Sequence, residues 1–384
     1  MESSKKVLLV TRPIAPPWDE ASKNFAYFLA KNVKDIRFGL LTKGSVSDLS
    51  DNVAQHPIYT SSSLNLKFSQ KIKLLKLVSL RKEYDVLHFM LTPAKLNSWA
   101  FKNFVVNKKI KTIQTVATLR EDLFSDSDFK KILFADLIIT YSDHAKNKLE
   151  SLGFPNVKRV YPGIDLEYYK PMKVRGGSTA TMEVKPPLLK KWNINPEDFV
   201  VTYPGEYVRL GCTDDIVNMI LQYYSILEEK NIKIFFACRI KNEEDRIKKE
   251  EIIAKLKENN CLDQVVFAET VADMAKLDNL SDVIIFPVRN MKGKFDVPLA
   301  AIEPMACEKP VIVSDLPILK EFANEKNSVT IERGNVGQLK DAIIDLYENP
   351  GKRNSIGKEG RKFCEENFDI KKIAGIYKEI YEQL

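Results

Sequence analysis

The sequence lacks any long apolar run. Its apolar stretches are short, as in VLLV at 7–10 and VIIF at 283–286. A membrane-spanning helix needs about 18 or more consecutive apolar residues, so none is predicted. The first 18 residues also have too short an apolar core for a secretory signal peptide, and Arg12 interrupts it. The sequence therefore predicts a cytoplasmic protein.

Cysteine and histidine are both scarce. The five cysteines are odd in number and form no CxxC pair, which argues against a disulfide framework and against zinc. A reduced setting and no metal site are expected. The short acidic run Asp126-Ser-Asp128 is interpreted as a solvated loop. The three histidines are His56, His88 and His144.

Charge is unevenly distributed along the chain. Residues 1–180 hold 29 Lys and Arg against 17 Asp and Glu, whereas the remainder holds 30 against 35. A basic N-terminal half suggests an anionic partner, either a membrane or a nucleic acid, although lysines can also serve solubility alone. Nucleic acid fits poorly because no finger, helix-turn-helix or RNA-binding aromatic motif is present.

Strand-like and helix-like segments alternate through the 384 residues, which predicts an α/β protein with two doubly wound, Rossmann-like domains facing a central cleft. The domains are expected at 1–172 and 191–368. Residues 173–190, rich in Gly, Pro, Ser and Thr, are interpreted as a linker. Such sheets bind ligands at the carboxyl ends of their strands. Helices are expected near 22–33, 95–106, 213–230, 242–259, 336–348, 350–367 and 369–382.

The stretch KFDVPLAAIEPMACEKPVIVSD, residues 294–315, suggests a nucleotide site. Helix N-termini attract phosphate through free N–H groups, and proline suits a helix start. Glu303 lies one turn into the expected helix, where a carboxylate can accept hydrogen bonds from two ribose hydroxyls. A solvated Glu is the alternative. The candidate diphosphate contacts are Lys292, Lys294, Val297, Pro298, Leu299 and Ala300, with the helix end at 298–300 stabilising the leaving group.

These residues and four further segments resemble family 4 retaining glycosyltransferases, which have the two-domain GT-B fold. With the domain pattern, the resemblance covers nearly the whole chain. It implies that residues 369–384 cross back to the first domain and that a nucleotide-sugar donor is used with no cofactor or metal. The segments are 135–154, 160–171, 296–322, 334–350 and 351–381.

The sequence departs from the family pattern at two positions. Phe295 stands where the family has a first glutamate, and neighbouring Asp296 is a candidate to reach the donor sugar or, alternatively, to cap the following helix. Glu206 stands where the family has an arginine, which leaves Gly205 and Arg209 as donor-site candidates in that loop. Pro304 inside the expected helix predicts either a kink or an irregular helix.

The first domain offers candidates for contact with the acceptor. Asp19, Glu20 and Ser22 precede or open the first expected helix, where Asp19 or Ser22 could instead act as ordinary caps. His88 lies in an expected strand and His144 at an expected helix start. No histidine occupies the family's usual position near 112–122.

Two stretches of the first domain combine lysine with apolar residues. Residues 64–82 carry six Lys or Arg, and residues 94–111 carry five lysines with Trp99, Phe101 and Phe104. A basic amphipathic helix can lie on an anionic membrane, although its apolar stripe can equally pack on the sheet. Such a surface would suit a lipid-linked acceptor at the inner face of a membrane.

Together these features predict a retaining glycosyltransferase that moves a sugar to an acceptor hydroxyl of a lipid-linked or cell-surface glycan precursor. One alternative is a catalytically silent relative that acts as a partner or regulator, which Glu206 and Phe295 would favour. Another is an epimerase or phosphorylase of the same fold. The donor base, the sugar and the acceptor are left open.

Overall fold

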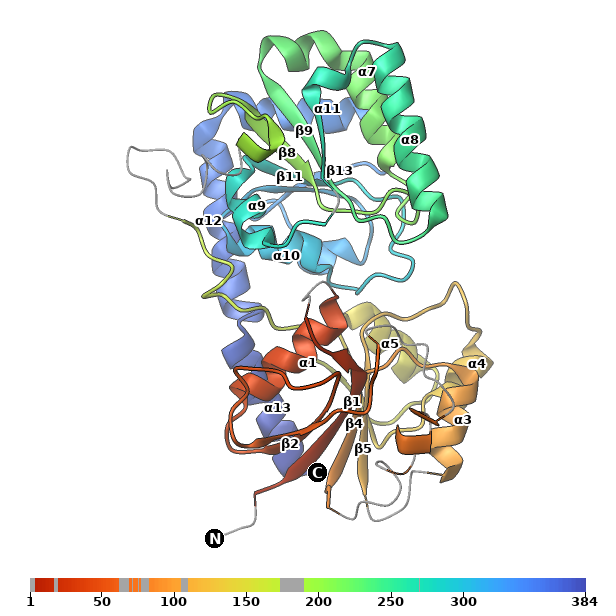
Figure 1. Cartoon of the computed structure of the whole chain (residues 1–384). Coiled ribbons are helices and arrows are strands. Elements are labelled where there is room, and N and C mark those ends of the chain that lie inside the picture. Colours follow the sequence, from red (N-terminus) through yellow and green to blue (C-terminus); the bar gives the residue numbers. More distant parts are fainter. Residues whose placement is uncertain are drawn as a thin grey trace. The chain divides into compact units, whose positions relative to one another are not determined.

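The protein divides into two compact units (Figure 1). Unit 1 comprises residues 1–165 and 367–384, and unit 2 comprises residues 166–366. The structure, a computed structural model, describes residues 4–16, 20–61, 69–70, 72–74, 76, 83–104, 110–172, 190–268 and 270–384. All of the predicted linker at 173–190 except Lys190, and most of the basic stretch at 64–82, therefore lie outside the described residues.

Unit 1 is built on a seven-stranded parallel sheet in the order β3-β2-β1-β4-β5-β6-β7. Its strands are β1 (Lys6–Ile14), β2 (Arg37–Thr42), β3 (Val53–His56), β4 (Val86–Phe89), β5 (Lys111–Val116), β6 (Leu137–Thr140) and β7 (Val157–Arg159). Its helices are α1 (Ala21–Asn32), α3 (Lys95–Phe104), α4 (Asp126–Ile132), α5 (Asp143–Ser151) and α13 (Ile370–Gln383).

The central strands β1 and β4 of unit 1 are mostly apolar and buried, because helices cover both faces of a parallel sheet. Helices α1 and α13 pack side by side on the same sheet (Figure 1). Phe25 of α1 contacts the rings of Tyr141 and Tyr377, and Tyr381 of α13 contacts Phe38 of β2. The last helix of the chain is thus part of the unit 1 core.

The acidic run at 126–128 is not the solvated loop that the sequence predicts. It forms the first turn of α4, where the Ser125 hydroxyl accepts the N–H of Asp128 and the Asp128 carboxylate accepts the N–H of Ser125. This reciprocal arrangement is a capping box, which satisfies two N–H groups at the helix start.

Unit 2 has a six-stranded parallel sheet in the order β10-β9-β8-β11-β12-β13. Helix α7 packs against α8 and α11, and α9 packs against α10. The strands are β8 (Phe199–Tyr203), β9 (Ile232–Ala237), β10 (Val265–Ala268), β11 (Val283–Phe286), β12 (Val311–Ser314) and β13 (Val329–Ile331). The helices are α7 (Thr213–Glu229), α8 (Glu243–Glu258), α9 (Met274–Leu280), α10 (Leu299–Ala306), α11 (Val336–Glu348) and α12 (Pro350–Asn367).

The strand order of unit 2 reverses direction between β8 and β11. In an open α/β sheet this switch point is where the loops leaving two adjacent strands diverge, which opens a crevice at the carboxyl edge. The two loops at this edge are residues 204–212 and 287–298. The predicted fold class, two doubly wound α/β units, is confirmed.

Within the described ranges, no helix is both long and apolar enough to span a bilayer.

Candidate functional site

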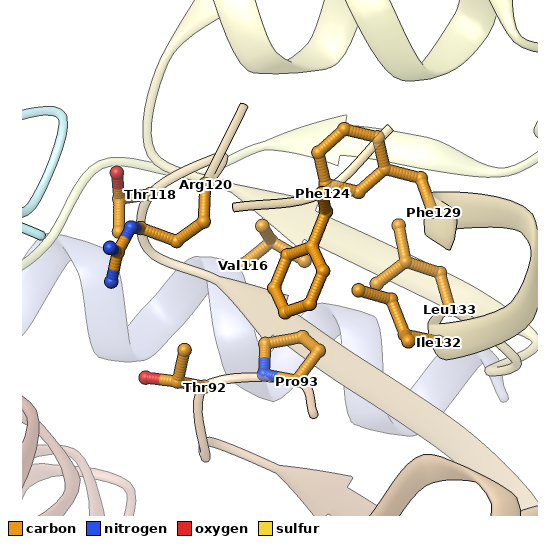
Figure 2. A pocket seen from close by; sticks show the side chains of 9 residues that line it. All are labelled: Thr92, Pro93, Val116, Thr118, Arg120, Phe124, Phe129, Ile132 and Leu133. Atoms are coloured by element: carbon orange, nitrogen blue, oxygen red, sulfur yellow. The ribbon is translucent and has the colours of Figure 1, made fainter. Parts of the chain in front are cut away.

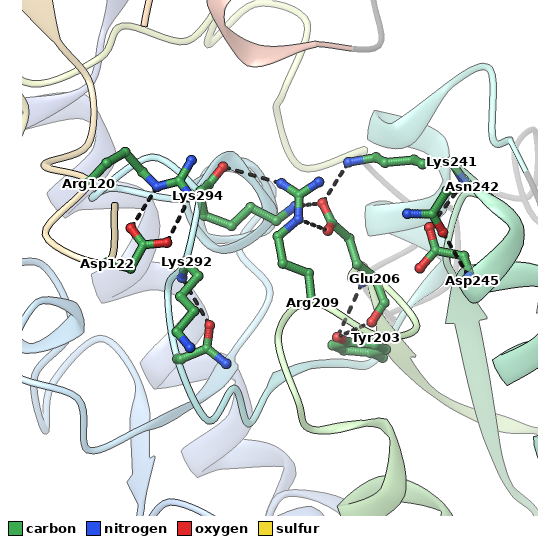
Figure 3. Close-up of polar contacts among 12 residues, drawn as sticks. Arg120, Asp122, Tyr203, Glu206, Arg209, Lys241, Asn242, Asp245, Lys292 and Lys294 are labelled. Atoms are coloured by element: carbon green, nitrogen blue, oxygen red, sulfur yellow. Dashed lines mark hydrogen bonds and ion pairs between the residues drawn. The ribbon is translucent and has the colours of Figure 1, made fainter. Parts of the chain in front are cut away.

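A buried carboxylate organises three cations at the switch point of unit 2 (Figure 3). Glu206 follows β8 and is only 3% exposed. Its Oε1 lies 2.6 Å from Lys241 Nζ and 2.9 Å from Lys294 Nζ, and its Oε2 lies 3.0 Å from Arg209 Nε. These four residues are called the Glu206 cluster below.

The members of the Glu206 cluster come from three neighbouring loops. Glu206 and Arg209 follow β8, Lys241 follows β9, and Lys294 follows β11. Because the carboxyl ends of parallel strands meet at one edge, residues distant in sequence converge there. Arg209 also donates to the Gly293 carbonyl at 3.4 Å, which links the loops after β8 and β11.

Electrostatics keep the Glu206 carboxylate ionised. Burial alone would raise the pKa of Glu206, but the ammonium groups of Lys294 and Lys241 outweigh it and lower the pKa to about 2. Burial lowers the pKa of the Lys294 ammonium, and Glu206 partly offsets this effect. One negative and three positive charges leave a net charge of about +2, which would favour a multiply charged anion.

The cluster changes how the departure at Glu206 is understood. The sequence predicts a lost phosphate contact at Glu206, with Arg209, Lys292 and Lys294 as the candidate cations and without Lys241. In the structure, Glu206 forms ion pairs with three cations, and Lys241 is one of them. The signal for Lys241 is the acid itself, because a buried carboxylate at a strand end requires nearby cations. Lys292 is exposed and its ammonium has no ion pair with another described residue.

Helix α10 presents the second part of the candidate site. Its N-cap residue is Pro298, which has no N–H, so the helix end at 298–300 offers the N–H groups of Leu299 and Ala300. Val297 is fully buried. Asp296 is buried and is not the N-cap residue.

Pro304 lies inside α10, close to the C-terminus of the helix. The helix stops at Ala306, two residues after Pro304, with Cys307 as its C-cap. The carbonyl of Pro304 accepts the N–H of Cys307 at 2.9 Å and that of Lys309 at 3.0 Å, which closes the helix. Because the proline lies close to this end, its missing N–H disturbs little of the helix.

Glu303 is a buried acid on α10. Burial raises the pKa of Glu303 to about 8, and the nearby Tyr169 hydroxyl partly offsets this rise. Asp278 of α9 is fully buried, and neither carboxyl oxygen has a hydrogen-bond partner among the described residues. Burial and the nearby Glu303 raise the pKa of Asp278 well above its usual range. The alternative of a solvated Glu303 is therefore wrong.

Gly205 is required by close packing rather than by a turn. A Cβ at this position would lie 1.9 Å from the Tyr203 ring, so no larger residue fits there. The Tyr203 hydroxyl donates to the Glu206 carbonyl at 3.0 Å and accepts the Glu206 N–H at 3.3 Å. Gly205 and Tyr203 thus fix the loop that carries the cluster.

The acceptor candidates of unit 1 are scattered. Glu20 is the N-cap residue of α1 without a side-chain cap, and its carboxylate accepts from Arg12 at 2.9 Å. Ser22 lies inside the first turn, so the prediction that it caps α1 is wrong. Asp19 lies outside the described residues. His144, at the start of α5, is exposed and its Nε2 lies 3.0 Å from Glu121.

The prediction that His88 contacts the acceptor is wrong. His88 is fully buried, its Nδ1 bonds the Tyr381 hydroxyl at 2.8 Å, and its Nε2 bonds the Thr115 hydroxyl at 2.7 Å. Its ring also stacks on Tyr377. Burial lowers the pKa of His88 to about 3, so it is a neutral core residue that joins the sheet to α13.

A match to a known protein family lies within unit 2. Residues 186–363 match the family model for glycosyl transferases group 1. Spore coat protein SA of Bacillus subtilis is 26% identical over 262 residues, 64% of each chain. The capsular polysaccharide biosynthesis glycosyltransferase CapM of Staphylococcus aureus is 25% identical over 175 residues, 45% of this chain and 43% of CapM. The matches thus span less than two thirds of either relative.

Solved structures extend the likeness to the fold of both units. Anabaena HepE, solved in complex with UDP and glucose, has a TM-score of 0.74 with 15% identity and covers 100% of both chains. WaaG, a glycosyltransferase of lipopolysaccharide biosynthesis, has a TM-score of 0.68 with 11% identity. The fold is that of GT-B glycosyltransferases. Residues 186–363 thus resemble a glycosyltransferase domain of group 1.

Proposed function

We propose that the protein is a retaining glycosyltransferase of family 4 that moves a sugar from a nucleoside-diphosphate sugar to an acceptor hydroxyl. The Glu206 cluster is the observation that carries this proposal. Its net positive charge lies at the switch point of the sheet, beside the loop that leads into α10. A diphosphate matches this charge, and Glu303 would accept hydrogen bonds from the ribose.

In the proposed reaction, unit 2 acts mainly through electrostatics. Negative charge builds on the diphosphate as the bond to the sugar breaks, and Arg209, Lys241 and Lys294 would stabilise it. These cations would serve the role that a metal ion serves in other transferases, so we expect transfer to proceed in the presence of EDTA. Asp296 would contact the donor sugar. The leaving phosphate would take the acceptor proton on the same face of the sugar, which retains the configuration.

The proposed acceptor is a lipid-linked or cell-surface glycan precursor bound by unit 1. Helix α3 exposes 72% of Leu96 and 56% of Trp99, and Lys102 on the same helix is exposed. An apolar pocket in the same unit has polar Thr92, Thr118 and Arg120 grouped on one side (Figure 2). Apolar and cationic side chains together suit peripheral binding at the anionic inner face of a membrane.

The donor assignment is tested by calorimetric titration with UDP, GDP, ADP, CDP and inorganic pyrophosphate. Wild type should bind at least one nucleoside diphosphate, and pyrophosphate more weakly. Lys241→Gln should weaken binding by roughly tenfold or more, since hydrogen bonds to charged groups contribute about 1.5–3 kcal/mol. Lys255→Gln on α8, whose ammonium donates to Asn218, is the matched control and should bind normally.

The silent-partner alternative is favoured by Phe295, since no acid occupies that position. It would be preferred if no diphosphate bound to wild type.

Membrane binding is tested separately by sedimentation with vesicles of neutral or anionic lipid. The double change Leu96→Ser and Trp99→Ser should reduce binding to anionic vesicles, and unchanged binding would exclude α3 from the contact.

A further inference from the structure

The cations of the Glu206 cluster are more exposed than the carboxylate that joins them. The side chain of Glu206 is 3% exposed, and its three partners converge on it (Figure 3). The partners are 23%, 32% and 44% exposed, in the order Lys294, Lys241 and Arg209. The carboxylate therefore lies on the inner side of the cluster, and an anion that arrives from solvent meets the cations first.

The main chain holds this carboxylate in place. The Tyr203 hydroxyl bonds both the carbonyl and the N–H of Glu206, at 3.0 Å and 3.3 Å, and the Cys212 thiol donates to the same hydroxyl at 3.1 Å. The ring of Tyr203 also leaves no room for a side chain at Gly205. Because Glu206 is both buried and anchored, a bound anion has to share the cations with it rather than replace it.

Each cation keeps donors for a second anion. An ammonium group carries three N–H donors and a guanidinium group carries five. Among the described residues, Lys241 and Lys294 form ion pairs with Glu206 alone. Arg209 directs Nε to Glu206 and one further nitrogen to the Gly293 carbonyl. All three cations can therefore bind an anion on their outer side while Glu206 remains on the inner side.

We propose that Glu206 is a specificity-determining residue that acts as the built-in counter-anion of the empty site. It shares the cations with the bound diphosphate and so weakens its binding, most strongly for the free diphosphate that is left after transfer. The inference rests on the proposed function, which assigns the diphosphate to this cluster. Its consequence is that the site releases its product more readily than three unopposed cations would.

Charge distinguishes the product from the donor. A nucleoside diphosphate carries about three negative charges at about pH 8 and its sugar ester about two, because the free terminal phosphate has a second ionisation near pH 6. Contacts of about 2.8 Å on both sides of one ammonium place a ligand oxygen about 5–6 Å from the carboxylate. Repulsion at that distance acts on every charge of the ligand, so it opposes the free diphosphate more than the ester.

The same carboxylate stabilises the empty site. Without it the three cations repel one another, and a bound polyanion relieves that repulsion. Ligand and carboxylate thus stabilise the same cations, and part of the attraction available to the ligand is already satisfied before it binds. Loss of the carboxylate should therefore make the empty protein less stable and make the stabilisation by ligand larger.

The test is calorimetric titration of wild type and Glu206→Gln at about pH 8. The ligands are inorganic pyrophosphate, whichever of UDP, GDP, ADP and CDP binds most tightly, and the glucose ester of that nucleotide. Glu206→Gln should bind pyrophosphate about 3–30-fold more tightly than wild type, as expected when one unit charge about 5–6 Å away is removed. The gain for the free nucleoside diphosphate should exceed the gain for its ester by about threefold or more.

Glu250→Gln is the matched control. It changes the charge of the chain by the same amount, but Glu250 is an exposed residue of α8 that pairs with Arg246, so all affinities should equal those of wild type. Melting gives a second measurement, in which pyrophosphate should raise the Tm of Glu206→Gln by more than that of wild type. If Glu206→Gln does not fold, the same change is made in a Lys241→Gln background, where only two cations remain to repel each other. There it should again tighten pyrophosphate binding relative to Lys241→Gln alone.

The outcomes separate this inference from the proposed function. Unchanged or weaker pyrophosphate binding on loss of the carboxylate, in whichever background folds, would overturn the inference alone, because Glu206 would then serve only to hold the cations. An equal gain for the free nucleoside diphosphate and its ester, or an equal gain in Glu250→Gln, would also overturn it. If no nucleoside diphosphate bound to wild type or to the variant, the proposed function would fail and the inference with it.

Discussion

Replacing Glu206 with glutamine should destabilise unit 2 at neutral pH. The change keeps the shape of the side chain but leaves Arg209, Lys241 and Lys294 close together without their shared carboxylate. The pKa of Glu206 falls from 4.5 to about 2 in the folded protein. At about 1.4 kcal/mol per pKa unit, this shift corresponds to about 3 kcal/mol of stability in a group that is almost fully buried.

The pH dependence has a definite sign. A carboxyl with a lowered folded-state pKa stabilises the protein above its unfolded pKa, and that stabilisation is lost as pH falls through the folded value. The difference in the free energy of unfolding between wild type and Glu206→Gln should therefore reach its full value above about pH 4.5. It should shrink as pH falls toward about 2. Effects of other carboxyls appear in both proteins and cancel.

Urea unfolding followed by Trp192 fluorescence is the assay, because this tryptophan packs on Phe235 in the unit 2 core. Trp18 and Trp99 are first replaced by phenylalanine so that the signal reports on unit 2. If the free energy of unfolding falls by about 2 kcal/mol per molar urea, the unfolding midpoint of Glu206→Gln should lie about 1.5 M below that of wild type at pH 7.

The control is Glu250→Gln, which removes an exposed ion pair with Arg246 on α8. Exposed pairs contribute about 0–1 kcal/mol, so the midpoint should barely move. A loss below about 1 kcal/mol in Glu206→Gln, or a difference from wild type that does not change between pH 5 and pH 2, would refute the electrostatic account of the cluster.

Three further predictions concern the nucleotide site and the unit 1 core. Glu303→Ala should weaken nucleoside diphosphate binding by roughly ten- to a hundredfold, and unchanged calorimetric affinity in the folded variant would remove Glu303 from the site. Lys294→Ala should reduce affinity for nucleoside diphosphates more than for nucleosides, and equal losses would contradict a diphosphate role. Because His88 has a pKa of about 3 in the folded protein, unit 1 should lose stability as pH falls below about 6.5. In His88→Gln that part of the pH dependence should disappear from urea unfolding curves, and its persistence would assign it to other groups.

Much of the fold could be predicted because it depends on local patterns. The periodicity near 213–230 and 242–259 predicts α7 and α8 to within a residue or two at each end. Strand β3 at Val53–His56 is not evident from the sequence because it is short and because two of its four residues, Gln55 and His56, are polar. The run at 126–128 was interpreted as a loop because its capping box depends on Ser125 and Asp128 acting together.

The candidate site could be predicted only in part. Glu303 was identified because its carboxylate stands alone in an apolar helix beside a basic loop. Lys241 could not be found in this way, since only the sheet order brings the end of β9 beside Glu206. His88 was misassigned because its partners, Thr115 and Tyr381, are far away in sequence, so no local pattern reveals that it is enclosed.

The return of the chain to unit 1 has a consequence for folding during synthesis. Residues 367–384 supply Tyr377 and Tyr381, which cover His88 and complete the core of unit 1. The ribosome makes them after all of residues 166–366. Unit 2 is therefore complete in sequence while unit 1 still lacks its last helix, although unit 1 is begun first. Multidomain chains usually fold from the N-terminus onward. Here this order is reversed at the final step, because unit 1 is completed after unit 2. Until α13 is made, an apolar face of the first sheet is left for chaperones to protect.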